Sequence, residues 1–129
     1  MDEGRGLGIG EAAARAGTSV HTLRYYESAG LLVRPPGRDP AGRRRYDDDD
    51  LRWIVVVQRL RATGMPVAAV RAYADLCRAG AGNEAQRLEL LLAHRETVRA
   101  QLEEVGGHLA AIEAKISGYR RSARSVRSA

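Results

Sequence analysis

A narrow apolar stripe in the last third of the chain constrains the fold more than any other feature of the sequence. Between residues 83 and 120, apolar side chains recur at spacings of three and four, and Arg95 fills the one interrupted slot. This heptad pattern predicts a helix about 55 Å long with a single apolar seam. The seam comprises Leu88, Leu91, Val98, Leu102, Val105, Leu109, Ile112, Ile116 and Tyr119.

Such a helix needs a partner, because a domain built from residues 1–80 is too small to cover the whole seam. The simplest partner is a second copy, in an antiparallel coiled coil over residues 83–120. The alternative is a helix that folds back on its own domain. The residues expected at the dimer interface are Leu91, Val98, Leu102, Val105, Leu109, Ile112 and Ile116.

Special residues mark the ends and the middle of the long helix. Asn83 is the expected N-cap, and Gln86 follows three residues later, as in a capping box. Gly106 and Gly107 together cost ~1–2 kcal/mol of helix stability against alanine and indicate a close crossing or a soft point. Residues 121–129 are polar and basic, and we expect a disordered tail there.

Two short segments near the N-terminus form a candidate helix-turn-helix. Helices are expected over residues 8–16 and 19–28, after a frayed end at residues 1–6. Gly17 supplies the backbone freedom for the turn, and Ser19 is a good N-cap for the second helix. The alternative is an ordinary helical hairpin with a solvated polar face.

The second of these helices has one apolar face and one polar face. The polar face carries no acid before Glu27, so its side chains can bond phosphates or base edges. We therefore expect this helix to enter the major groove of DNA. The candidate DNA contacts on it are Ser19, His21, Thr22, Arg24 and Tyr25.

Positive charge is concentrated in the same part of the chain. Residues 5–46 contain eight Arg and three acids, so this segment alone equals the formal net charge of +5, which suits a polyanionic partner. Residues 34–46 hold three prolines, two glycines and five arginines, which predicts a small β-hairpin, or wing, beside the helix-turn-helix. A disordered basic loop is the alternative. The wing residues expected to contact DNA are Arg38, Arg43 and Arg44.

A run of four aspartates, residues 47–50, precedes a predicted helix over residues 48–62. Asp47 can cap this helix and the other acids suit its first turn, which we prefer to a metal site. Arg61, near the end of the helix, is expected to reach a backbone phosphate. Its apolar stripe is assigned to Leu51, Ile54, Val55, Gln58 and Leu60.

Turn residues and a short apolar run complete the first domain. Gly64 suits the end of the third helix, and Pro66 suits the first position of a fourth helix over residues 66–78. The apolar run at residues 31–33 is either a strand or a plug in the core.

Composition limits the protein class. A single cysteine cannot form an internal disulfide, the N-terminus is polar, and no apolar run approaches a membrane span. We therefore expect a cytoplasmic, nucleoid-associated protein without a membrane partner. Phe is absent and much of the apolar content is Ala, so the core is expected to be thin.

These stretches together resemble the MerR family of bacterial transcription regulators. The likeness is strong over residues 8–80 and extends to the long helix by architecture. The matching segments are residues 9–13, 17–19, 22–27, 30–32, 42–46, the aspartate run with Leu51, and residues 60–66.

The resemblance implies a mainly α fold: a winged helix-turn-helix head, two more helices and a long C-terminal dimerisation helix. It implies a homodimer that binds a near-palindromic promoter operator and bends and untwists the DNA, which affects RNA polymerase through the promoter. For this chain we expect no cofactor, no metal site and no catalytic activity. Family-type DNA contacts fall on Arg24, Tyr25, Arg44 and Arg61, whereas Arg43 stands where the family usually has Tyr.

The effector is left open by the sequence. Metal sensors of this family carry cysteines after the long helix and often one near the end of the fourth helix, where Cys77 lies, but residues 78–129 contain no cysteine. The aldehyde- and thiol-stress branch has a reactive cysteine near the position of Arg59. For Cys77 we consider a core residue, a redox-reactive thiol or a metal ligand.

Three other protein classes fit parts of the pattern. An architectural or recombination accessory protein would bend DNA with the same head. An enzyme built on Cys77 and a histidine lacks an orienting acid and an oxyanion hole. A coiled-coil adaptor would use the basic head to bind an acidic protein.

Overall fold

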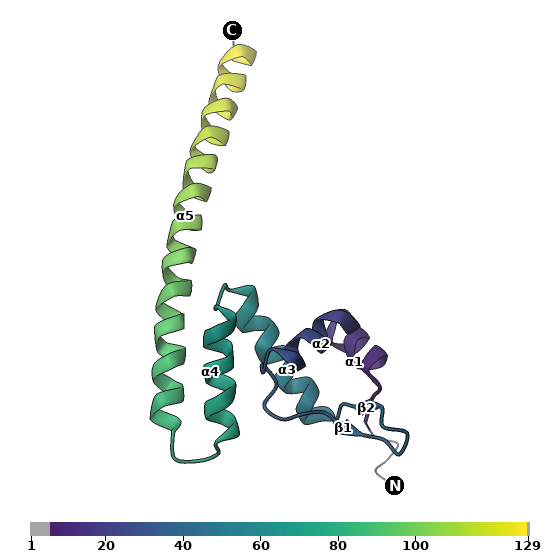
Figure 1. Cartoon of the computed structure of the whole chain (residues 1–129). Coiled ribbons are helices and arrows are strands. Elements are labelled where there is room, and N and C mark those ends of the chain that lie inside the picture. Colours follow the sequence, from purple (N-terminus) through teal and green to yellow (C-terminus); the bar gives the residue numbers. More distant parts are fainter. Residues whose placement is uncertain (1–5, 129) are drawn as a thin grey trace. The chain divides into compact units, whose positions relative to one another are not determined.

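The computed structural model describes residues 6–128 and is mainly helical (Figure 1). It contains two compact units, Met1–Leu90 and Leu91–Ala129. The first unit holds four helices, a small hairpin and residues 84–90 of the long helix. Residues 1–5, where most of the expected frayed end falls, and Ala129 lie outside the described residues.

The helix-turn-helix is formed by α1 (Ile9–Ala16) and α2 (Val20–Ser28). Gly17 has a φ of 70°, a left-handed conformation that glycine adopts without a Cβ clash. Ser19 is the N-cap of α2, and its Oγ accepts a hydrogen bond from the Thr22 N–H at 3.0 Å. Both turn predictions are confirmed, and each helix begins within one residue of its expected position.

The apolar run after α2 is a plug in the core and not a strand. Leu31 is fully buried and Leu32 nearly so. Trp53 Nε1 donates to the Leu31 carbonyl at 2.7 Å, and the Trp53 ring stacks on Tyr73 with centroids 5.7 Å apart. Arg78 also donates to the Leu32 carbonyl. The plug therefore connects the helix-turn-helix to the third and fourth helices.

The third helix, α3 (Asp48–Ala62), begins with a capping box. Asp47 Oδ1 accepts from the Asp50 N–H, and Asp50 Oδ2 accepts from the Asp47 N–H, both at 2.9 Å. Arg34 binds both carboxylates, at 2.5 Å to Asp47 and 3.0 Å to Asp50. The predicted cap is confirmed.

The buried face of α3 differs from the predicted stripe. Ile54 and Val57 are fully buried, whereas Val55 is exposed. Residues 54–57 are all apolar, so helical periodicity does not decide which of them faces the core. Gln58 lies toward α1 and donates to the Ala16 carbonyl at 2.8 Å, which satisfies an acceptor at the end of that helix.

The fourth helix, α4 (Val67–Arg78), buries Val70 and Ala74. Gly64, with a φ of 89°, lies in the turn after α3, as expected. Pro66 is the N-cap of α4 and not its first helical residue, a shift of one position from the prediction. Cys77 is a free, half-buried thiol on this helix.

The long helix, α5, spans Glu84–Ser128. Residues 121–128 are therefore helical, and the prediction of a disordered tail is wrong for them. Arg, Ala and Ser tolerate helix well, and cations near a helix C-terminus interact favourably with its dipole. Asn83 uses its side chain for tertiary contacts, donating to the Leu76 carbonyl and accepting from Arg87 Nε. Within residues 6–128, none of the helices combines the length and apolarity needed to cross a bilayer.

The capping box at Asp47 yields a stability prediction. Hydrogen bonds from the Asp50 N–H and from Arg34 hold the pKa of the Asp47 carboxyl below its ordinary 3.8. Asp47→Ala should lower the free energy of unfolding by about 1 kcal/mol at pH 7. A depressed carboxyl pKa stabilises the fold above the unfolded-state value, so the deficit should shrink as pH falls below about 4.

Urea titrations between pH 2.5 and pH 7 measure this effect. Asp49→Ala is the control, because Asp49 is exposed in the same first turn and pairs with Arg52 at the surface. Equal losses for the two variants, or a deficit that grows in acid, would contradict the assigned role of Asp47.

Candidate nucleic-acid interface

A five-residue turn shapes the end of the wing. The wing pairs β1 (Gly37–Arg38) with β2 (Arg44–Arg45) in antiparallel register, Gly37 opposite Arg45 and Arg38 opposite Arg44. Asp39 Oδ1 accepts from the N–H groups of Ala41 and Arg43, each at 2.9 Å. These bonds lower the pKa of the Asp39 carboxyl, so it stays ionised. The predicted wing is confirmed, and the disordered-loop alternative is not.

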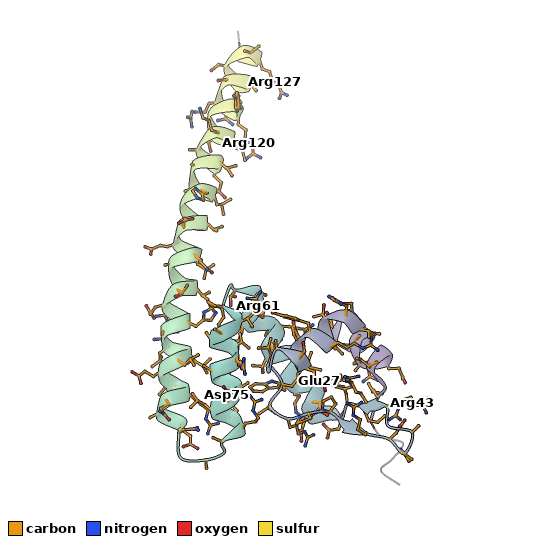
Figure 2. All side chains as sticks on the ribbon, in the orientation of Figure 1. Glu27, Arg43, Arg61, Asp75, Arg120 and Arg127 are labelled. Atoms are coloured by element: carbon orange, nitrogen blue, oxygen red, sulfur yellow. The ribbon has the colours of Figure 1, made fainter. Side chains whose placement is uncertain are left out.

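An ion pair fastens the wing to the second helix. Arg44 Nε donates to Glu27 Oε1 at 2.5 Å, and both side chains are largely shielded from solvent. Glu27 lies on α2 (Figure 2). Burial, together with the nearby Glu27 carboxylate, raises the pKa of Tyr46, which follows β2 directly. The contact fixes the position of the hairpin relative to the helix-turn-helix.

The space between α2 and the wing is a groove of about 490 Å³ with basic walls. Arg24 contributes from α2, and every arginine of the two wing strands and their turn contributes from the other side. Asp39 is the one acid among the residues that line it. The full lining is Gly8, Ile9, Arg24, Arg38, Asp39, Gly42, Arg43, Arg44 and Arg45.

Arg45 is a groove residue that the sequence analysis did not single out. Its Nε is buried and has no hydrogen-bond acceptor among the described residues. A buried guanidinium donor without an acceptor is costly unless a ligand supplies one. The run of three arginines before Tyr46 was the available signal, but strand alternation did not show which of them turns inward.

The other wing arginines differ in how they are held. Arg43 is 80% exposed at the turn (Figure 2) and makes a 3.2 Å contact with Asp39. Arg38 Nη1 donates to the Gly42 carbonyl at 3.0 Å. Both side chains are therefore oriented by the hairpin while remaining accessible to a ligand.

The predicted α2 residues fall into two groups. Ser19 and Thr22 are hydrogen-bonded to each other at the helix cap, with 3.0 Å between their hydroxyl oxygens. Their first role is structural. His21 and Arg24 are exposed, and the Tyr25 ring is 45% exposed, 6.5 Å from the Tyr26 ring. The accessible polar surface of α2 is thus provided by His21, Arg24 and Tyr25.

Arg61 does not line the groove. Its Nη1 donates to the Met65 carbonyl at 2.7 Å and closes the turn after α3 (Figure 2). The same guanidinium lowers the pKa of Tyr26, which burial raises more strongly. Arg61 therefore supports the α3–α4 turn in the free protein.

No cluster of three or more His, Cys, Asp or Glu side chains suited to a metal ion occurs in the described part of the chain. Cys77 lies beside Tyr73, and burial with the neighbouring thiol raises the pKa of that tyrosine. These contacts place Cys77 at the edge of the aromatic pair formed by Trp53 and Tyr73.

Comparison with known proteins agrees with this geometry. Residues 7–77 match the family model described as the MerR HTH family regulatory protein. The chain belongs to the MerR family. The match covers both helices of the helix-turn-helix, the wing and most of α4, so the groove lies wholly inside it.

Relatives extend the likeness of this MerR protein beyond the head. An HTH-type transcriptional regulator of Haemophilus influenzae is 34% identical over 112 residues, 87% of this chain and 82% of the relative. A crystal structure of HiNmlR, a MerR family regulator lacking the sensor domain and bound to promoter DNA, has a TM-score of 0.81 at 33% identity. The match covers 90% of this chain and 91% of HiNmlR.

A second solved structure gives the same fold. A MerR family transcriptional regulator from Listeria monocytogenes has a TM-score of 0.84 and is 34% identical, covering 88% of this chain and 85% of that one. The predicted fold class, with a winged head and a long C-terminal helix, is therefore confirmed.

The ion pair between Glu27 and Arg44 yields a prediction for this MerR protein. Glu27→Gln preserves the side-chain shape but removes the charge, so the wing should open more often. For a pair worth about 1 kcal/mol, the Asp39 amide in the hairpin should exchange about fivefold faster. Hydrogen–deuterium exchange with residue resolution measures this.

The matched control is Glu11→Gln, which removes an exposed carboxylate in the first turn of α1. Wing exchange should be unchanged in this variant. Unaltered exchange at Asp39 in Glu27→Gln would show that the hairpin is held by its backbone pairing alone.

Proposed function

We propose that the protein is a transcription regulator that binds double-stranded promoter DNA through the winged head. In this proposal α2 lies in the major groove, and the wing contacts the flanking phosphate backbone. The basic groove that unites Arg24 of α2 with the wing arginines supports it most directly. A second support is that HiNmlR, whose structure matches 90% of this chain, was solved bound to promoter DNA.

The arrangement assigns different tasks to different side chains. Arg24, His21 and Tyr25 are accessible on α2 and are suited to base edges or phosphates. Arg38, Arg43 and Arg45 are suited to phosphate contacts, which add affinity without sequence discrimination.

The predicted roles of Ser19, Thr22, Arg44 and Arg61 are secondary in this proposal. Each of these side chains is engaged within the protein, and Arg44 is held by Glu27. A guanidinium has five N–H donors, so Arg44 and Arg61 retain donors for phosphate. Their main contribution is to orient the wing and the turn after α3.

The regulator acts as a homodimer in this proposal. Large apolar side chains of α5 are exposed along the predicted seam, including Leu102 at 68% and Val105 at 62%. A soluble monomer rarely leaves so long an apolar stripe uncovered. Two heads joined by paired α5 helices would bind a two-fold symmetric operator in the cytoplasm.

Control of transcription follows from DNA deformation. Two heads at a fixed spacing can bend and untwist the duplex between their half-sites. RNA polymerase is then affected indirectly, through the geometry of the promoter. Transcription can be measured from templates that differ only in the length of the spacer between the two promoter elements. A regulator should change transcription at one particular spacer length, whereas an architectural DNA-bending protein should show no such dependence.

Arg24→Ala tests the DNA-binding surface. Loss of this groove residue should weaken operator binding by ~1–3 kcal/mol and reduce the salt dependence of binding. The operator is obtained by footprinting on the DNA upstream of the protein's own gene, and affinity is measured by fluorescence anisotropy at several salt concentrations.

Arg52→Ala is the matched control for this experiment. Arg52 is also an exposed arginine of the head, but it pairs with Asp49 on α3 and does not line the groove. Its removal should leave affinity within error. Unchanged affinity in Arg24→Ala would remove the groove from the proposed interface.

Leu102→Asp tests the dimer. It places a charge at the most exposed leucine of the seam, so the protein should become monomeric in light scattering while the head stays folded. Ala100→Asp adds the same charge two residues earlier, off the seam, and should remain dimeric. A dimeric Leu102→Asp protein would refute the role of the seam.

A further inference from the structure

The apolar seam of α5 extends beyond Tyr119, where the seam predicted from the sequence ended. Because the helix continues to Ser128, the next two seam positions are Ala123 and Val126, at spacings of four and three. Val126 is 76% exposed. Of the exposed large apolar residues described in the second unit, Leu92 lies beside the seam. The others occupy seam positions, and they are Leu102, Val105, Leu109, Ile112, Ile116, Tyr119 and Val126.

We propose one specific pairing register for two copies of α5, an inference that rests on the proposed homodimer. The helices run antiparallel, and seam residues equally far before and after Gly107 face each other. This register gives every seam residue from Leu88 to Val126 a partner in the second copy. The facing pairs are Leu88 with Val126, Leu91 with Ala123, Arg95 with Tyr119, Val98 with Ile116, Leu102 with Ile112, and Val105 with Leu109.

The charged seam residue supports this register over its neighbours. Arg95 faces the partner's Tyr119, whose ring is 75% exposed and can accept the guanidinium on its face. A slip of one heptad in either direction would place Arg95 opposite an isoleucine or a valine. An arginine buried against an aliphatic side chain loses its hydration without compensation.

Charges beside the seam favour the same register. In an antiparallel pair, positions on one flank of the seam face the same flank of the partner. On the flank that carries Gly106, residues equally far before and after Gly106 face each other, so Arg99 faces the partner's Glu113. This ion pair occurs twice in the dimer. A slip of one heptad would oppose Arg99 to a glycine in one direction and to the partner's Arg120 in the other.

The register also accounts for the first of the two glycines in mid-helix, Gly106. Nothing within 4 Å of Gly106 or Gly107 in their own chain would obstruct a Cβ, so the fold of one subunit does not require glycine there. Glycine nevertheless weakens a helix. In the proposed register Gly106 lies on the flank of the seam next to the two-fold axis and faces its own copy, where the absence of a side chain allows the helices to approach closely. Gly107 lies on the opposite face of the helix, away from the partner.

Cross-linking of single-cysteine variants measures the register directly. His108→Cys, in a Cys77→Ser background, places a thiol on the flank next to the axis, about 3 Å along the helix from its own copy. A short bifunctional maleimide should therefore convert the dimer to a covalent dimer. Gln101→Cys lies on the same flank one heptad earlier, about 18 Å from its copy, and should stay uncross-linked.

Two results would overturn the register. Cross-linking of Gln101→Cys in place of His108→Cys would show a slipped pairing. Efficient cross-linking of Leu102→Cys to its own copy would show parallel helices. Because light scattering and operator binding are measured on the same proteins, a wrong register in an intact, DNA-binding dimer is distinguished from failure of the proposed homodimer.

A charge exchange tests the contact between Arg95 and Tyr119. Tyr119→Arg should raise the dimer dissociation constant at least tenfold, because it opposes two arginines twice in each dimer. Adding Arg95→Tyr to that variant restores one arginine opposite one tyrosine and should recover most of the loss. A double variant that dissociates as readily as Tyr119→Arg would show that these residues do not face each other.

Discussion

Carboxylates that neutralise the arginines of the wing are the interaction on which the head depends. Five arginines in so short a hairpin repel one another, and the sequence alone suggested that a polyanionic partner neutralises them. In the structure, Arg34 binds Asp47 and Asp50, Arg43 binds Asp39, and Arg44 binds Glu27. These pairs hold the hairpin in place before any ligand arrives. Arg24, Arg38 and Arg45, which form none of these ion pairs, add positive charge to the same groove that Arg43 and Arg44 line.

Much of the head could be predicted because its boundaries depend on local chemistry. A left-handed glycine, a serine cap and an acidic capping box each act within about four residues. Gly17, Ser19 and Asp47 take these three roles, as their residue types predict. The proline- and glycine-rich wing was predictable for the same reason. Such signals do not depend on which other segment packs nearby, and they therefore survive in a sequence considered alone.

Tertiary contacts account for what the sequence did not show. Val57 is buried and Val55 is exposed because of where α1 and the plug at Leu31 lie. The spacing of apolar residues in the sequence does not show where those segments pack. The sequence predicted a DNA contact for Arg61 but did not show that its guanidinium also bonds the turn that follows it. The partnership of Glu27 with Arg44 joins residues from two elements, and nothing local indicates it.

The proposed pairing register of α5 matters for DNA recognition because it sets the distance between the two heads. Each residue adds about 1.5 Å to a helix, so a slip of one heptad changes the separation of the two α5 N-termini by about 10 Å. Half-sites on one face of a duplex repeat every 34–36 Å, or about one turn. A slip of that size would move one head by nearly a third of a turn, out of phase with its half-site. A dimer that reads a two-fold operator therefore needs a seam with one register, and an apolar stripe alone does not provide it. In the proposed register, Arg95 and the charges at Arg99 and Glu113 would make the neighbouring registers unfavourable, so a few polar residues on an otherwise uniform helix pair would set the spacing of the two heads.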